Sequence, residues 1–405
     1  MLQFIATKIQ TFDTIRSIFE EIIIKKMKNS IIHCDLDTFF VSVERLLNTQ
    51  LIGKPVLIGG ESGRSVVASC SYEARQYGIH SAMPMQLARR LCPDAIIVNG
   101  DFDKYSYYSD MVTEILEDET PVVEKASIDE HYINVTGMDK FFGTWKFTQE
   151  LRQKIMRESG LPISFGLSIN KTVSKIATGE AKPCGAQKVD FGKEKGFLAP
   201  LSIRKIPGIG PKTYTQLRNM GVGKIATLQE MPQNMLVRVL GKTGSQIWEK
   251  ANGLDNSPVL PFVRQKSMSK EHTFEEDTID LILLKSTLFT LIEKLSYDLR
   301  MQGQLTSCIA VKLRYSNFDT FTSQAKITYT SSTKVLEKKA WELFEKLYKK
   351  RIRIRLIGIK FSDLIQGAYQ IDLFEDTEKD LHLMQAMDNI RSKYGFHSLK
   401  RGFSL

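Results

Sequence analysis

The chain of 405 residues is 42% hydrophobic and 25% charged, an ordinary composition for a folded protein with sizeable cores. It contains no run of about 18 apolar residues, which excludes a transmembrane helix. The net charge of +10 favours a polyanionic partner, and the length predicts more than one domain.

Five cysteines without any CxxC spacing are typical of reduced thiols in a cytoplasmic protein and argue against a zinc site. Residues 1–28 lack the shape of a secretory signal, because their short apolar run Ile22–Ile24 is flanked by charge on both sides. They are either an amphipathic helix of the protein or an upstream extension before a natural start near Met27.

Residues 30–183 alternate between strand and helix patterns. Strands are expected at 30–34, in "GKPVLIGG", before Tyr72, around the acidic centre of "EKASIDEHYINVTG", and in "PISFGLSIN". Helices are expected at 41–47, from Tyr72, at 84–91, 103–116 and 146–159, and from Lys171. This part of the chain is therefore predicted to be a mixed α/β domain.

The predicted secondary structure of the remaining chain changes at residue 184 and again after a linker. Residues 184–256 have a helical pattern, and residues 257–266, with two prolines and little periodicity, are predicted to be a linker. The order that follows is strand, helix (about 279–303), strand, strand, helix (about 333–348), strand, which predicts a split βαβ, or ferredoxin-like, module. The acidic run "EEDTID" at 275–280 is interpreted as a solvated helix start, and the tail is expected to be helical around 381–394.

Positive charge is concentrated in the C-terminal half. Residues 184–256 contain 11 Lys and Arg against 5 Asp and Glu, and residues 257–372 contain 19 against 13, whereas residues 30–100 contain 6 of each. In "KKRIRIR", Arg351, Arg353 and Arg355 alternate with isoleucines, which places them on one face of a strand. This is either a solvated sheet face or, near a carboxylate site, a track for phosphates.

Two acidic clusters mark a candidate site. Asp35 and Asp37 share one face at the end of the first strand, as a solvated strand end or as metal ligands. "SIDE" adds Asp129 and Glu130, which alone would be a hairpin turn with solvated carboxylates. Together the clusters predict a site on adjacent strands for two divalent metal ions, with Mg²⁺ favoured by oxygen ligands and phosphates. Such a site is typical of phosphoryl or nucleotidyl transfer.

Five motifs then occur in the order and spacing of the Y-family translesion DNA polymerases: "DLDTFFVSVE", "SYEARQYGI", "ASIDE", "GLSINKTVSKIAT" with "AKPCG", and "IPGIGPKT". Over residues 29–372 the chain resembles the bacterial DNA polymerase IV (DinB-type) branch of that family. The resemblance implies a multidomain α/β fold shaped like a right hand. Its parts would be an N-terminal extension (1–28), a palm (29–38 and 101–183), fingers (39–100), a helical thumb with a helix–hairpin–helix (184–256), a linker (257–266), a ferredoxin-like little finger (267–369) and a tail (370–405).

The resemblance also implies the catalytic residues. Asp35, Asp129 and Glu130 match the metal-binding carboxylates, the Leu36 carbonyl matches the backbone ligand, and the cofactor would be two Mg²⁺ ions. Asp37 lies outside that set, so we expect it to make a structural hydrogen bond.

The contacts to the incoming dNTP follow in the same way. Phe40 matches the steric gate, a ring under the sugar that would clash with a ribose 2′-OH, and Phe39 would pack close to the same sugar. The remaining nucleotide contacts would come from Ser69, Tyr72, Arg75 and Lys175.

Two further motifs imply macromolecular partners. "IPGIGPKT" is a helix–hairpin–helix signature, in which Gly208, Gly210 and Lys212 would contact the DNA backbone, as Arg351, Arg353 and Arg355 would. The tail "QIDLF" resembles the motif that docks into the bacterial sliding clamp (β subunit), with Gln370, Leu373 and Phe374 as anchors. Otherwise it is a fifth strand or a loose end. Primer–template DNA, dNTPs and the clamp are thus the expected partners of a cytoplasmic monomer.

Two positions depart from the family pattern, namely Thr38 and His131. We expect the His131 side chain to point away from Glu130, because successive strand residues face opposite ways. The leading hypothesis is a template-directed DNA polymerase of low fidelity, without a proofreading exonuclease, that performs translesion synthesis. One alternative is a two-metal cyclase or nuclease, which would not explain Phe40 or the helix–hairpin–helix. The other is a catalytically inactive DNA- and clamp-binding accessory protein.

Overall fold

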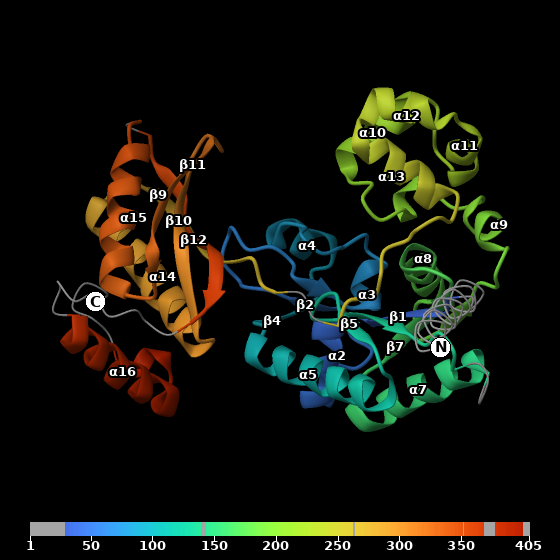
Figure 1. Ribbon diagram of the computed structural model, residues 1–405, viewed down its shortest axis with the longest axis horizontal. Helices are drawn as coiled ribbons and strands as arrows, with labels where there is room; N and C mark the ends of the chain where they lie inside the picture. Colours follow the sequence, from blue (N-terminus) through green and yellow to red (C-terminus); the bar gives the residue numbers. More distant parts are fainter. Residues whose placement is uncertain (1–28, 139–142, 262–263, 351, 368–376, 400–405) are drawn as a thin grey trace, which may run out of the picture. The chain divides into compact units, whose positions relative to one another are not determined.

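The computed structural model describes residues 29–138, 143–261, 264–350, 352–367 and 377–399. The chain divides into two compact units, residues 1–263 and 264–405, each described separately below (Figure 1). The predicted N-terminal extension, Arg351 and the three tail anchors Gln370, Leu373 and Phe374 lie outside the described residues. Within the described ranges, no helix is long and apolar enough to cross a membrane.

The main sheet of the first unit carries the acidic clusters. Its strand order is β5–β6–β1–β7–β8, with β1 (Ile31–Leu36) in the centre. β1 is antiparallel to β6 (Glu130–Asn134) and to β7 (Ile163–Ser168). β5 (Val123–Lys125) and β8 (Ala186–Lys188) are the edge strands. In this register Asp35 lies opposite Glu130, so the two sequence clusters meet on one sheet face.

The two faces of this sheet are covered differently. Ile32, Cys34 and Leu36 of β1 are buried in a core with α5 (Phe102–Glu119) and α7 (Thr144–Ser159). His33 and Asp35 lie on the opposite face, which is covered by α8 (Lys171–Ala181) (Figure 1). The period of two along β1 thus separates core side chains from site side chains.

Gly166 of β7 allows α8 to lie close to the sheet. It is the register partner of His33. A Cβ atom at this position would lie 2.1 Å from the Ser174 carbonyl oxygen and 2.5 Å from the Thr178 nitrogen, both in the backbone of α8. Any larger residue at position 166 would therefore push α8 away from β1 and β7.

The rest of the first unit forms a small sheet and a helical region. The sheet order is β3–β2–β4, with β2 (Val56–Ile58), β3 (Ser69–Cys70) and β4 (Ile96–Val98). The helical elements between β1 and β4 in the chain are α2 (Phe39–Leu47), η1 (Thr49–Leu51), α3 (Tyr72–Arg75) and α4 (Met85–Leu91). The helical region, with its own apolar core, consists of α9 (Glu194–Leu198), η2 (Ile203–Lys205), α10 (Pro211–Asn219), α11 (Ile225–Glu230), α12 (Gln233–Leu240) and α13 (Lys242–Ala251).

The second unit has the predicted order of elements. These are β9 (Ser267–Thr278), α14 (Leu281–Met301), β10 (Gln304–Tyr315), β11 (Thr320–Thr330), α15 (Thr333–Leu347) and β12 (Ile354–Gln366). The sheet order β11–β10–β12–β9 places β12 between β9 and β10, and β10 between β11 and β12. Both β–α–β units are therefore split by another strand, which confirms the predicted layout.

Two local predictions need correction. The interpretation of "EEDTID" as a helix start is wrong for Glu275–Asp277, because these residues belong to β9, which pairs with β12. Asp280 alone has the predicted role at a helix start: it is the N-cap residue of α14 and accepts hydrogen bonds from the Ile282 and Leu283 N–H groups. In "KKRIRIR", β12 begins only at Ile354, so Arg353 precedes the strand that contains Arg355.

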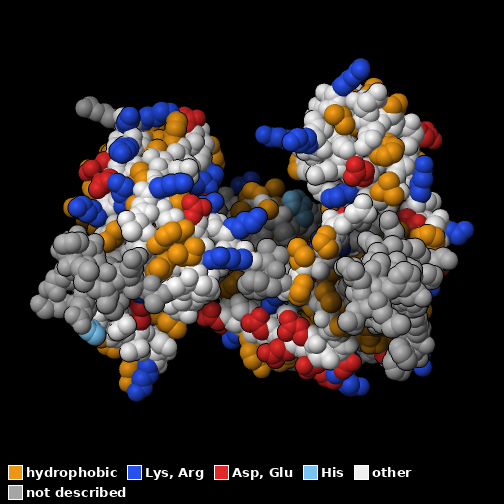
Figure 2. Space-filling view, in the orientation of Figure 1, with side chains coloured by type: hydrophobic (Ala, Val, Ile, Leu, Met, Phe, Trp, Pro, Cys, Tyr) orange, Lys and Arg blue, Asp and Glu red, His pale blue; other side chains and the backbone are white. Residues whose placement is uncertain are grey.

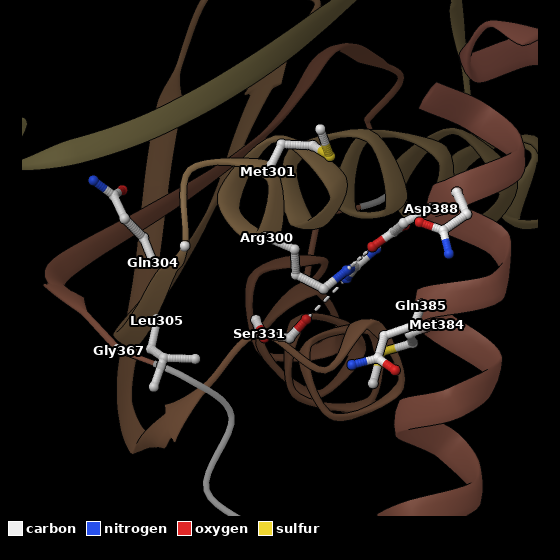
Figure 3. A pocket seen from close by; sticks show the side chains of 11 residues that line it. Arg300, Met301, Gln304, Leu305, Ser331, Gly367, Met384, Gln385 and Asp388 are labelled. Carbon is white, nitrogen blue, oxygen red and sulfur yellow. Dashed lines mark hydrogen bonds and ion pairs between the residues drawn. The ribbon is translucent and has the colours of Figure 1, made fainter. Parts of the chain in front are cut away.

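The predicted tail helix is confirmed as α16 (Thr377–Tyr394), followed by η3 (Phe396–Ser398). It packs against α14 through two ion pairs. Asp388 receives two hydrogen bonds from the Arg300 guanidinium, and Arg391 lies 2.6 Å from Glu293 with both side chains buried. A cavity of about 550 Å³ lies between α16 and the end of α14, lined by Met301, Leu305 and Met384 (Figure 3).

We predict that Gly166→Ala lowers the free energy of unfolding by about 1–3 kcal/mol, because the added methyl group overlaps the backbone of α8. Chemical denaturation would measure this. Gly179→Ala is a matched control, since Gly179 is exposed on α8 with nothing within 4 Å of an added Cβ. The control is expected to stabilise the chain by about 0.5–1 kcal/mol. Equal responses of both variants would contradict the close packing of α8.

Candidate active site

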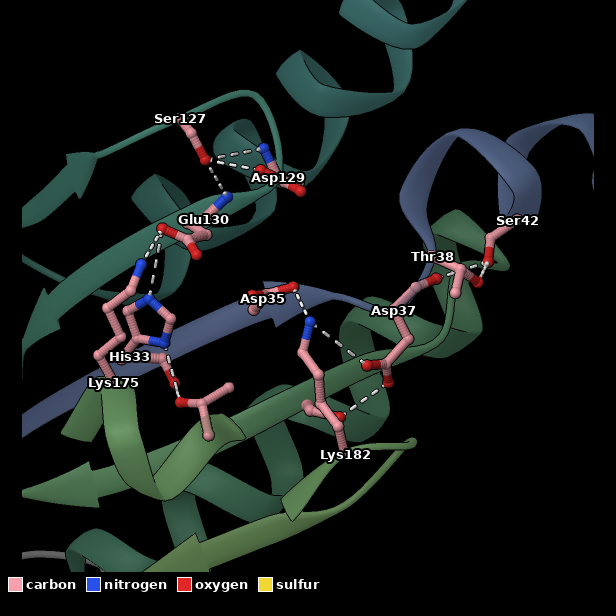
Figure 4. Close-up of polar contacts among 12 residues, drawn as sticks. His33, Asp35, Asp37, Thr38, Ser42, Ser127, Asp129, Glu130, Lys175 and Lys182 are labelled. Atoms are coloured by element: carbon pink, nitrogen blue, oxygen red, sulfur yellow. Dashed lines mark hydrogen bonds and ion pairs between the residues drawn. The ribbon is translucent and has the colours of Figure 1, made fainter. Parts of the chain in front are cut away.

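The three predicted catalytic carboxylates lie at one end of the main sheet (Figure 4). Asp35 ends the polar face of β1, and Glu130 lies opposite it at the start of β6. The Leu36 N–H donates to the Asp129 carbonyl oxygen at 3.0 Å, which joins the two strand ends. The Ser127 hydroxyl donates to Asp129 Oδ1 at 2.6 Å and so orients that carboxylate. The structure therefore brings Asp35 together with Asp129 and Glu130, which follow it by 94 and 95 positions in the sequence.

One ridge of α8 faces this end of the sheet. Lys171, Lys175 and Thr178 recur at helical spacing, and Lys182 follows directly after the helix. Lys175 Nζ lies 2.5 Å from Glu130 Oε2. Lys182 forms an ion pair with Asp35, and its Nζ lies 3.8 Å from Asp37 Oδ1. Asp35 and Glu130, the two predicted catalytic carboxylates on the strands, thus each have their own lysine from α8 or the residue after it.

The two paired carboxylates have very different affinities for protons. Burial raises the pKa of Asp35 to about 7; Lys182 opposes this change, and the charges of Asp129 and Glu130 add to it. The pKa of Glu130 is lowered to about 2, because His33 and Lys175 both face its carboxylate. Glu130 is therefore held in its charged form, whereas burial disfavours the charged form of Asp35.

The donor set fits a hard divalent cation, because three carboxylates and the Leu36 carbonyl supply only oxygen ligands. Asp35 and Glu130 each form an ion pair with a lysine (Figure 4). Consistent with this, no three acidic, histidine or cysteine side chains of the described residues form a ready metal cluster. Metal binding would therefore require the lysines to exchange partners.

Asp37 has the structural role that we expected. Its side chain is only 1% exposed. Oδ2 accepts hydrogen bonds from the Ser164 hydroxyl and the Cys184 N–H, each at 2.7 Å. Oδ1 accepts from the Tyr72 hydroxyl at 3.2 Å. One buried carboxylate thus connects β1, β7, α3 and the segment after α8.

The two residues that depart from the family pattern, Thr38 and His131, are both buried. Thr38 adopts a left-handed conformation (φ 44°) where the chain turns from β1 into α2. His131 is fully buried and points away from Glu130, as expected, with Nε2 2.9 Å from Thr113 Oγ1 of α5. Burial lowers the pKa of His131 to about 3, so this histidine remains neutral.

The two aromatic residues after β1 differ in exposure. Phe39 is 3% exposed and belongs to the core, whereas Phe40 is half-buried. The Phe40 ring stacks on Tyr105, with ring centroids 4.2 Å apart, and the Tyr105 hydroxyl donates to Glu44 at 2.6 Å. Phe40 is therefore held in a fixed orientation near the end of β1.

Of the predicted nucleotide contacts in β3 and α3, Tyr72 makes a hydrogen bond to Asp37. Tyr72 begins α3 and reaches Asp37, and its pKa is raised, mainly by burial. The exposed Arg75 guanidinium lies 5.0 Å from the centre of the Tyr72 ring. Ser69 is half-buried in β3. The structure thus joins Tyr72 and Arg75 to the site through Asp37.

The predicted DNA contacts of the first unit are exposed. Gly208 has a positive φ of 104° in the turn before α10, and Gly210 is the N-cap residue of that helix. Gly208, Gly210 and Lys212 are all exposed. In the second unit Arg353 is exposed, and Arg355 lies 4.7 Å from the Phe318 ring. Figure 2 shows many lysines and arginines on the C-terminal unit and acidic side chains near α5.

The sequence analysis missed Lys182 and His33. Lys182 pairs with Asp35 although the two residues are 147 positions apart, and no local pattern connects them. The signal was the spacing of Lys171, Lys175, Thr178 and Lys182 along one helix ridge. His33 lies on the same strand face as Asp35, with Nδ1 2.8 Å from Thr178 Oγ1 and Nε2 3.9 Å from Glu130 Oε2.

Comparisons with family models cover most of the described chain. Residues 34–179 match the impB/mucB/samB family, and residues 265–373 match its C-terminal domain. Residues 204–255 match the model described as "DNA polymerase-iota, thumb domain".

Curated relatives and solved structures agree with these matches. The chain is 37% identical to DNA polymerase IV of Dehalococcoides mccartyi (strain CBDB1), covering 92% of this chain and 96% of the relative. It is 35% identical to DNA polymerase IV of Treponema denticola, over 91% and 95% of the two chains. A Y-family DNA polymerase chimera of Dbh and Dpo4 superimposes with a TM-score of 0.77 at 28% identity, covering 84% of this chain and all of that chain. The insertion ternary complex of Dbh DNA polymerase has a TM-score of 0.62 at 27% identity, with the same coverage.

The fold and the carboxylate site define a DNA-directed DNA polymerase. More specifically, the chain belongs to the impB/mucB/samB family of Y-family translesion DNA polymerases. Polymerases of this family depend on divalent metal ions, which agrees with the oxygen-rich donor set described above.

We predict that Asp37→Ala lowers the free energy of unfolding by about 2–4 kcal/mol, because three hydrogen-bond donors lose their buried acceptor. Denaturant titration would measure the change. Asp190→Ala is the control, since the Asp190 side chain is 67% exposed and forms an ion pair with the exposed Lys188; a change within about 0.5 kcal/mol is expected. A stable Asp37→Ala protein would contradict the role of Asp37 as a structural acceptor.

Proposed function

We propose that this chain performs two-metal, template-directed DNA synthesis past damaged bases, by transfer of deoxynucleotides to a primer 3′-OH. The observation that carries this proposal is the placement of Asp35 opposite Glu130, with Asp129 one residue before, under the lysines of α8. Carboxylates supply the ligands, and lysines supply the charge that a triphosphate needs.

Two Mg²⁺ ions held by Asp35, Asp129, Glu130 and the Leu36 carbonyl would stabilise charge on the attacking and leaving oxygens. The protein's own residues would prepare for this. Lys182 and Lys175, which form ion pairs with Asp35 and Glu130, would turn to the phosphate oxygens of the incoming dNTP. Arg75 and Tyr72 would hold the same triphosphate from α3, with Ser69 nearby.

Asp37 would support this exchange without taking part in it. Its carboxylate accepts hydrogen bonds from Tyr72 and from the backbone of Cys184, two residues after Lys182. A single buried group therefore positions contacts on both sides of the nucleotide. This connection supports Lys182 as a triphosphate contact in addition to Lys175.

Phe40 would select the sugar of the nucleotide. Its ring stacks on Tyr105, and the Tyr105 hydroxyl is held by Glu44. A ring with this support cannot easily move to admit a ribose 2′-OH. The proposal therefore includes discrimination against ribonucleotides at this position.

The wider assignments are also part of the proposal. The palm, fingers, thumb and little finger keep the boundaries predicted from the sequence. DNA would bind to the exposed turn around Gly208 and Gly210, Lys212 and the arginines of the C-terminal unit. Replication would be of low fidelity without a proofreading exonuclease, in a cytoplasmic monomer. Docking to the sliding clamp rests on the sequence "QIDLF" alone.

Primer extension on an undamaged template with Mg²⁺ and dNTPs is the direct test. We expect templated addition by the parent chain, and a fall of roughly a hundredfold or more for Asp129→Ala, which removes a metal ligand. DNA binding should persist in the variant, because the basic regions are unchanged. Asp190→Ala, a change to an exposed surface aspartate, should extend normally.

Absence of extension by the parent, with DNA still bound, would instead favour the inactive accessory protein. A template carrying an abasic site, run beside the undamaged one, would then test translesion synthesis itself. Failure on the damaged template alone would contradict bypass of that lesion and leave the polymerase assignment intact.

We predict that Phe40→Ala increases incorporation of ribonucleotides relative to deoxynucleotides, because the variant lacks the ring that would clash with the 2′-OH. Single-nucleotide extension with dCTP and CTP would give the ratio of kcat/KM. Phe102→Ala is the control, since Phe102 is 64% exposed at the start of α5. Unchanged sugar discrimination in a folded Phe40→Ala protein would rule out the steric gate.

A further inference from the structure

His33 is a buried polar residue beside the catalytic carboxylates for which the proposed reaction has no role. It is 1% exposed and lies on the same face of β1 as Asp35. Its Nε2 atom has no hydrogen-bond partner among the described residues. Buried polar atoms are rarely left without a partner, so this atom requires an explanation.

Glu130 is the acidic group that faces this nitrogen. The distance from His33 Nε2 to Glu130 Oε2 is 3.9 Å, too long for a hydrogen bond. The same carboxylate oxygen is held by Lys175 at 2.5 Å. One oxygen of Glu130 therefore has two neighbours (Figure 4). Lys175 is bonded to it, and His33 faces it without a hydrogen bond.

These two neighbours differ in mobility. Lys175 is 34% exposed at the end of a long, flexible side chain. His33 is fixed on three sides, by its own strand, by Thr178 Oγ1 at 2.8 Å from Nδ1, and by the Tyr132 ring at 4.7 Å between centroids. If Lys175 turns to a triphosphate, only the histidine remains in place beside Glu130.

The Thr178 hydroxyl is compatible with either tautomer of His33, so the facing Glu130 carboxylate decides which ring nitrogen carries the proton. The single Thr178 hydroxyl proton has three acceptors in reach, namely His33 Nδ1 and the carbonyl oxygens of His33 and Ser174. Donation to Nδ1 leaves the imidazole proton on Nε2, facing the carboxylate. The opposite tautomer would place a lone pair against a negatively charged oxygen, which is unfavourable.

We propose that His33 is a positioning residue that holds the Glu130 carboxylate by an Nε2–H hydrogen bond once the nucleotide has drawn Lys175 away. Groups that hydrogen-bond to metal-binding carboxylates typically change metal affinity or activity by roughly 10–100-fold when removed. This inference rests on the proposed function, since it takes Glu130 as a metal ligand and Lys175 as a phosphate contact.

The test measures metal binding without turnover. The full chain is mixed with primer–template DNA ending in a dideoxynucleotide and with the matching dNTP, and bound Mn²⁺ is followed by electron paramagnetic resonance. His33→Phe keeps a planar ring without the donor, and we expect Mn²⁺ affinity to fall by roughly tenfold or more. His33→Gln, which restores an N–H at similar reach, is expected to recover most of the affinity.

His131→Phe is the matched control. His131 is equally buried on the adjacent strand, but its side chain is on the other face of the sheet, against Thr113. We expect its Mn²⁺ affinity to remain near that of the parent, while thermal denaturation reports any loss of stability in each variant. Circular dichroism confirms that each variant is folded.

Two results would overturn the inference. One is a folded His33→Phe protein that binds Mn²⁺ as the parent does. The other is an equal loss in His131→Phe, which would show a general packing effect. A parent chain that neither binds Mn²⁺ nor extends a primer would instead count against the proposed function.

Discussion

The close approach of α8 to β7 at Gly166 is the constraint on which the site depends. Without a side chain at this position, the backbone at Ser174 and Thr178 can lie against the sheet. Lys175, Thr178 and Lys182 then reach Glu130, His33 and Asp35. The chemistry of the site is therefore set by a glycine that takes no part in it.

The charges at the site form a matched set. Lysines from one ridge neutralise carboxylates that would otherwise repel each other at the sheet end. A metal–triphosphate substrate contains the same two kinds of charge, with cations for the carboxylates and anions for the lysines. Binding would exchange partners without leaving a buried charge uncompensated, which lowers the cost of opening the ion pairs.

Much of the fold and of the candidate site could be predicted from the sequence, because both depend on local strand and helix patterns. Asp35, Asp129 and Glu130 stand in strand patterns, and adjacent antiparallel strands bring such residues together. Lys182 could not be predicted as the partner of Asp35, since their contact depends on how α8 packs on the sheet. "EEDTID" was misassigned because acidic residues favour helix starts, whereas Glu275–Asp277 belong to β9, in the irregular stretch between Thr273 and Thr278, the residues that pair with β12. Tertiary contacts decided both cases.

The docking of α16 has a consequence for the modularity of the chain. Arg391 and Asp388 contribute half of each ion pair that fastens α16 to α14, and Met384 is buried. A premature stop codon after β12 would deprive the buried Glu293 of its arginine and expose apolar surface of the C-terminal unit. The Leu399 carbonyl oxygen also accepts a hydrogen bond from Arg391. A unit exchanged between related polymerases would therefore have to include the chain as far as Leu399. The extension behaves as an integral part of the domain that it follows.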